Sequence, residues 1–160
     1  MKAIPLKKLK DELHHQTKDE LEALCIHLMK FKKENKELLT YLLFESHDEE
    51  NYVKNVKNFL NPLFEEINTK SFFYIRKSMR KILTLTKKYI RYSKQKETEI
   101  ELLLFYCEKL QNFSPDIQQS PRLKNVFDRQ LIFIQKAIET LHEDLQFEYQ
   151  PLLDALLKQK

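Results

Sequence analysis

The chain has 160 residues, of which 42% are hydrophobic and 32% are charged, and its formal net charge is +4. This length suits one domain with a core of its own, and a charge content above the usual quarter favours a large exposed surface. The sequence contains no glycine, although average usage of about 7% predicts roughly eleven. Glycine supplies the positive φ angles of tight hairpin turns and phosphate-binding loops, so this composition excludes a β-rich fold and the glycine-dependent nucleotide sites.

Helical spacing and capping residues predict helices along almost the whole chain. Residues 4–15 carry leucines at helical spacing, and Thr17 with Glu20 forms a capping box that opens a helix to about residue 33. Asn35 should break or bend the chain before a short leucine-rich helix. Longer helices are expected over about residues 48–67, 69–92, 95–113 and 120–145, with a kink or a segment end at Pro62 and a short terminal helix that begins at Pro151.

These elements predict an all-α fold in a single domain, residues 1–160, of seven to eight helices. The connections are short, so neighbouring helices should lie antiparallel. A faint similarity between residues 37–41 and 101–105 favours an antiparallel helical-hairpin array resembling a short solenoid. An irregular helical bundle is the alternative.

Targeting signals and cysteine usage predict the compartment. No apolar run approaches the ~20 residues that span a bilayer, and the first thirteen residues lack the features of a secretory signal. Cys25 and Cys107 both fall on apolar stripes, where they are expected to be small buried core residues. Reduced thiols and the missing signal favour the cytoplasm.

The strongest functional feature is a basic segment, residues 70–96, with ten basic residues and no acidic one. Of 28 basic and 24 acidic residues, 18 and 24 lie outside it, so the segment carries +10 and the remainder −6. Helical geometry places an apolar face on one side of this helix and two cationic stripes on the other. We predict that this basic face, within residues 70–94, binds a partner through nine residues: Lys70, Arg76, Lys77, Arg80, Lys81, Lys87, Lys88, Arg91 and Lys94.

So many positive charges on one helix repel each other, and negative charge is therefore expected nearby. The chain's own acids could supply it, from residues 45–50, 65–66 or 97–101. If they do not, the partner is expected to be an acidic protein surface, including self-association between copies, with non-specific nucleic-acid binding as the alternative. The sequence therefore predicts a non-catalytic binding or scaffold protein without a cofactor, and a small-molecule substrate is not expected.

Candidates for chemistry are few. Two E-x-x-H patterns, Glu12 with His15 and Glu139 with His142, have the spacing used in di-metal helical bundles. The helical positions place Glu139 outside the apolar stripe and His15 at a helix end, whereas a metal site needs all ligands to project inward. A di-metal carboxylate protein therefore stays a distant alternative, and we predict no catalytic and no metal-binding residue.

Several short runs lie along residues 6–110: Leu6 and Leu9, residues 18–21, 24–25, 34–39 and 42–45, and the basic pairs at 76–77 and 80–81. These runs resemble an uncharacterised family of small bacterial all-helical proteins. The resemblance implies a helical fold of unknown function, and it assigns no catalytic or binding residue.

Overall fold

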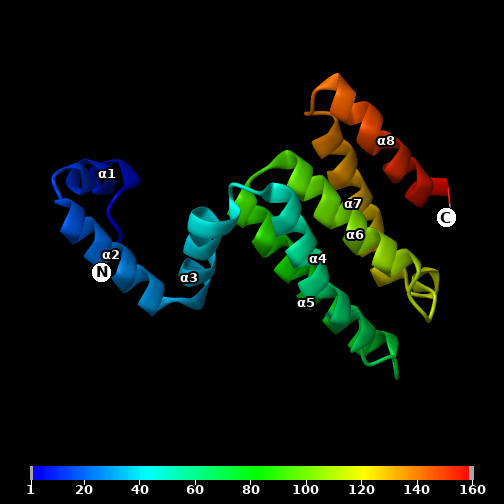
Figure 1. Ribbon diagram of the computed structural model, residues 1–160. Helices are drawn as coiled ribbons and strands as arrows, with labels where there is room; N and C mark the ends of the chain where they lie inside the picture. Colours follow the sequence, from blue (N-terminus) through cyan, green and yellow to red (C-terminus); the bar gives the residue numbers. More distant parts are fainter. Residues whose placement is uncertain (1, 159–160) are drawn as a thin grey trace. The chain divides into compact units, whose positions relative to one another are not determined.

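The computed structural model describes residues 2–158 and is all-helical, with helices over 82% of the chain and no strand among these residues (Figure 1). Eight α-helices, one π-helical turn and one 3₁₀ turn follow one another along the described chain. The predicted all-α class of seven to eight helices is confirmed. The chain divides into two compact units, Met1–Phe44 and Glu45–Lys160. Among residues 2–158, every helix is too short or too polar to cross a bilayer.

The first unit consists of three short helices. They are α1 (Leu6–His14), α2 (Lys18–Phe31) and α3 (Lys33–Thr40), and a π-helical turn, Tyr41–Glu45, follows α3. The predicted capping box is present, because the Thr17 hydroxyl accepts from the backbone N–H of Glu20 while the Glu20 carboxylate accepts from that of Thr17. No residue of α1, α2 or α3 is buried, so this unit has almost no core.

The break expected at Asn35 lies three residues earlier. Lys32 adopts an extended conformation between α2 and α3, and Asn35 lies inside α3. Its side-chain amide donates to the main-chain carbonyl of Leu28 at 2.8 Å. The asparagine therefore ties the two helices together across the bend instead of ending a helix.

The second unit contains five α-helices packed around one of them. The bounds are α4 (Glu49–Glu65), α5 (Phe72–Ser93), α6 (Lys96–Gln111), α7 (Pro121–Ile138) and α8 (Glu143–Lys158). Helix α6 contacts all four others, and α4–α5 and α7–α8 also pack as neighbouring pairs. These contacts join helices that are adjacent or two apart in the chain, so they fit a helical bundle, and stacked helical hairpins make contacts of the same kind.

Helix α6 occupies the centre because it is apolar around most of its circumference. Eight of its sixteen residues are buried, including the consecutive Leu102, Leu103 and Leu104. Consecutive residues of an α-helix point about 100° apart, so three buried in a row require neighbours on three sides. The hydroxyl of Tyr106, which is fully buried, donates to the main-chain carbonyl of Met79 on α5 at 3.1 Å and fixes the contact between these helices.

The ends of α4 and α5 differ in detail from the prediction. Asp48 is the N-cap of α4, and its carboxylate accepts from the N–H of Asn51. Pro62 lies inside α4, which continues to Glu65. Helix α5 begins after Ser71 instead of after Thr69, and it ends at Ser93; its C-cap Lys94 has a left-handed φ of 60°. That position usually carries glycine, and a lysine stands there in this glycine-free chain.

The last two helices also differ from the prediction. Helix α7 ends at Ile138, seven residues before the expected end, and α8 runs from Glu143 through Pro151 to Lys158. The predicted helix to residue 145 and the start at Pro151 are therefore wrong. The apolar stripe continues past residue 138, so periodicity alone did not reveal the turn at residues 139–142. The turn brings α8 back onto α6 and α7.

Candidate docking surface on helix α5

Helix α5 uses its apolar face to pack within the second unit. Ile75, Met79, Ile82 and Thr86 are buried, and α5 contacts α4 and α6. The Thr86 hydroxyl donates to the carbonyl of Ile82, so this buried polar group is satisfied within its own helix. Helix α5 is therefore amphipathic, as predicted from the sequence. Its apolar face is buried, and the opposite face is left at the surface of the second unit.

The nine predicted residues, here called the basic surface, lie on the remaining side of α5 and at its ends. Six of them are exposed, namely Lys70, Lys77, Arg80, Lys81, Arg91 and Lys94, and three are half-buried, namely Arg76, Lys87 and Lys88. The ammonium group of Lys87 lies 4.8 Å from the centre of the Phe133 ring on α7, and that of Lys88 lies 4.8 Å from the Tyr89 ring. Such cation–π contacts hold the stems in place without neutralising the charge.

Most cations of this surface form no ion pair with the described acids of the second unit. Within residues 45–158, ion pairs join Lys57 to Glu101 at 2.7 Å and Lys96 to Glu99 at 2.8 Å, and a third links His142 and Asp144. None of these pairs includes a residue of the basic surface. Eight of the nine cations, all except Lys88, form no ion pair with a carboxylate among residues 45–158.

Several acids that were candidates for neutralising the basic helix bind other groups. The Glu49 carboxylate accepts hydrogen bonds from the hydroxyls of Ser93 and Thr98, at 2.9 and 2.6 Å. Glu65 accepts from the side-chain amide of Asn61, and Asp48 caps α4. Glu49 thereby links the first turn of α4 to the junction of α5 and α6, where both hydroxyl-bearing residues are buried.

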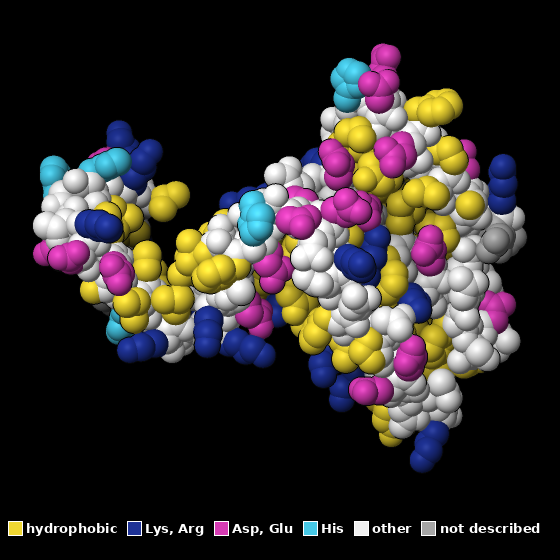
Figure 2. Space-filling view, in the orientation of Figure 1, with side chains coloured by type: hydrophobic (Ala, Val, Ile, Leu, Met, Phe, Trp, Pro, Cys, Tyr) yellow, Lys and Arg dark blue, Asp and Glu magenta, His cyan; other side chains and the backbone are white. Residues whose placement is uncertain are grey.

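Negative charge gathers instead on α6 and α8. A cavity of about 440 Å³ there is lined by Glu101, Glu108 and Glu148 together with Lys57 and the buried Tyr149. In Figure 2 acidic side chains are frequent over α4, α6 and α8, whereas basic ones gather at the margin of α4 behind which α5 lies. The second unit therefore carries separated positive and negative surfaces.

The pKa of Tyr149 is shifted by its buried position beside the acidic residues of this cavity. Burial raises the pKa of Tyr149 to about 12, and the negative charges of Glu101, Glu97 and Glu148 contribute in the same direction. The Tyr149 hydroxyl lies 3.5 Å from a Glu101 carboxylate oxygen. Both effects disfavour the tyrosinate, because ionisation would place a second negative charge beside Glu101 in a poorly solvated position.

The perturbed Tyr149 should make stability depend on alkaline pH. As the pH rises from about 10 to about 12, the unfolded chain loses the tyrosine proton first, so the free energy of unfolding should fall. We expect this loss to reach on the order of 2 kcal/mol, at about 1.4 kcal/mol per pKa unit, and to shrink in Tyr149→Phe. Chemical denaturation at several pH values measures it. The matched change Tyr74→Phe, at an exposed tyrosine, should keep the full decline; an unchanged decline in Tyr149→Phe would show that the assignment is wrong.

The candidate metal ligands are not brought together. Glu12 and His15 lie in the first unit and Glu139 and His142 in the second. Because α7 ends at Ile138, Glu139 and His142 lie in a turn and not one above the other on a helix face. Among residues 2–158, no three His, Cys, Asp or Glu side chains lie close enough together to hold a metal ion.

The two cysteines differ in environment. Cys107 is buried as predicted, and burial raises the pKa of its thiol, which keeps it protonated and unreactive. Cys25 is exposed, so its assignment to a core is wrong. It lies on the apolar stripe of α2 as expected, but no helix of the first unit covers that stripe completely.

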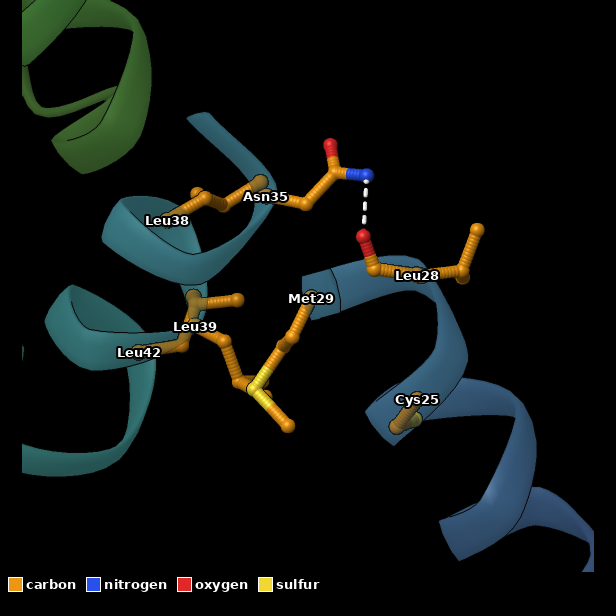
Figure 3. Close-up of a pocket in the computed structure, with 7 residues that line it drawn as sticks. All are labelled: Cys25, Leu28, Met29, Asn35, Leu38, Leu39 and Leu42. Atoms are coloured by element: carbon orange, nitrogen blue, oxygen red, sulfur yellow. Dashed lines mark hydrogen bonds between the residues drawn. The ribbon is translucent and has the colours of Figure 1, made fainter. Parts of the chain in front are cut away.

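An apolar groove between α2 and α3 was missed by the sequence analysis. It has a volume of about 230 Å³, and Figure 3 shows Met29 of α2 and Leu39 of α3 converging in it, with the Asn35–Leu28 hydrogen bond at its rim. The other lining residues are Cys25, Leu38 and Leu42. The leucine spacing marked these stripes as apolar, but it did not show that they remain open.

Comparisons of the chain with protein-family models, with curated proteins and with solved structures found no match. The described molecule is thus defined by its own features as an all-α protein with a concentration of positive charge on α5. The resemblance to an uncharacterised bacterial family stays a prediction.

Proposed function

We propose that this protein is a non-catalytic, cytoplasmic binding or scaffold protein whose basic surface on α5 docks an acidic partner protein. One observation carries the proposal: among residues 45–158, eight cations of this surface form no ion pair with a carboxylate, although the same unit holds a surplus of acids elsewhere. Outside residues 70–96, residues 45–160 contain nine basic and seventeen acidic residues, a net charge of −8.

The separation of charge supports an external partner. Like charges crowded on one helix face repel, and i, i+4 pairs such as Arg76–Arg80 and Lys77–Lys81 cost a few tenths of a kcal/mol each. A fold that kept its acids beside α5 would remove this cost. Here three of those acids instead bind Lys57, Lys96 and the hydroxyls of Ser93 and Thr98. An acidic partner surface would offset the repulsion on binding.

The surface beside α5 favours a protein over a nucleic acid. A cavity of about 340 Å³ between α4 and α5 is lined by Phe59, Leu63 and Leu85, and the charged side chains of Lys81 and Glu66 also line it. Phe59 is half exposed, and Phe73 at the start of α5 is exposed as well. Apolar and aromatic side chains next to cations suit an acidic protein surface that also presents apolar groups. Phosphate backbones need only the cations.

A binding experiment with two defined ligands tests the proposal. A fluorescent poly-glutamate peptide and a duplex DNA of equal charge are each titrated with the protein at increasing salt. We expect the peptide to bind at low salt through the basic surface. Binding of DNA alone, with log K falling at a slope of about −4.5 for five neutralised phosphates, would favour the nucleic-acid alternative. Binding of neither ligand would overturn the proposal.

A further inference from the structure

The first unit leaves an unusual amount of apolar surface open. Eleven large hydrophobic side chains of residues 4–44 are exposed, from 37% for Ile26 to 82% for Leu6. Together their exposed parts correspond to roughly 700–1,000 Å² of apolar area. This summed area is comparable to the roughly 800 Å² that each partner contributes to a standard protein interface.

Two parts of this unit complement each other in shape and chemistry. Helix α1 presents Leu6, Leu9 and Leu13 within one narrow stripe, all exposed, and α1 does not pack along α2 or α3. The groove between α2 and α3 is open and has an apolar floor (Figure 3). A short amphipathic helix is the kind of ligand that such a groove accepts, with anchors at i, i+3 and i+7.

We propose that two copies of this protein associate through their first units, with α1 of each copy docked in the α2–α3 groove of the other. Because each copy both donates α1 and accepts the other copy's α1, the association is a closed two-fold dimer in which both copies contribute the same surface. Residues 1–44 carry nine basic and seven acidic residues, a net charge of only +2. The strongly basic helix lies in the other unit, so identical first units approach each other without strong repulsion. This inference is independent of the function proposed for α5.

Oligomeric state tests the association. We expect the full chain to sediment as a dimer, and Leu9→Glu on α1 or Leu28→Glu in the groove to weaken dimerisation at least about 100-fold. Ile132→Glu on α7 is a matched control, because Ile132 and Leu28 are 53% and 54% exposed. It should leave the dimer intact, and circular dichroism should show unchanged helicity in all variants. A wild-type monomer at all concentrations would overturn the proposal, as would equal dimerisation by all variants.

A disulfide experiment tests the exchange itself. A tagged Leu9→Cys, Cys25→Ala chain is mixed with untagged wild type, so that a bond between residues 9 and 25 can form only between copies. Cys107 is buried and does not compete. Mild oxidation should give a covalent heterodimer of the tagged and untagged chains. Recovery of wild-type homodimers alone would show that α1 does not enter the groove of the other copy.

Discussion

Reversing Arg76, Arg80, Lys87 and Arg91 to glutamate should reduce binding to an acidic ligand at least about 100-fold. Each reversal removes an attraction and adds a repulsion, and exposed pairs contribute up to about 1 kcal/mol each. Four such changes on one stripe therefore exceed the roughly 2.7 kcal/mol that corresponds to a hundredfold change. Fluorescence anisotropy with the labelled poly-glutamate peptide at low salt measures the effect.

A matched control separates the basic surface from net charge. Helix α7 offers four exposed cations, Arg122, Lys124, Arg129 and Lys136. Reversing these to glutamate changes the net charge by the same −8 and leaves α5 intact. We expect this variant to keep most of the affinity. Equal losses in both variants would mean that only the overall charge matters, and full binding by the α5 variant would exclude this surface.

Replacing Leu102, Leu103 or Leu104 individually by alanine should cost about 2–5 kcal/mol of unfolding free energy each. All three side chains are buried, with 0%, 2% and 4% of their surface exposed. On a helix that packs with one face, at least one of three consecutive residues points to solvent and tolerates truncation. Three large losses in a row are therefore the expected signature of α6 at the centre of the bundle.

Urea denaturation followed by circular dichroism measures these losses. Leu152→Ala on α8 serves as the control, because Leu152 is 48% exposed and should lose less than about 1 kcal/mol. A small effect at any of the three positions would mean that the corresponding side of α6 is open, and the arrangement of five helices would then need revision.

Local rules explain why much of the secondary structure could be predicted. The capping box at Thr17 depends on residues three apart, and the buried face of α5 depends on a period of 3.6 residues. Both are properties of a short stretch of chain, and both are confirmed. The end of α7 at Ile138 was missed because the apolar period continues through a turn that no proline or glycine marks.

Burial depends on neighbours that are distant in sequence, and here prediction failed. Cys25 and Cys107 lie on similar apolar stripes, yet one is exposed and the other buried. The difference arises because α6 is surrounded by four helices, whereas α2 contacts mainly α3. The open α2–α3 groove follows from the same contrast.

The sequence by itself determined that this protein is helical, because a chain without glycine and with leucines at helical spacing has few other ways to satisfy its backbone and bury apolar groups. It also determined that one helix carries a concentrated positive charge. Only the tertiary structure decided where the acids lie relative to that helix, since ion pairing depends on distances of a few ångströms between segments far apart in the chain. By directing Glu49 to hydroxyl groups and Glu101 to Lys57, the fold leaves the positive charge of α5 on the surface.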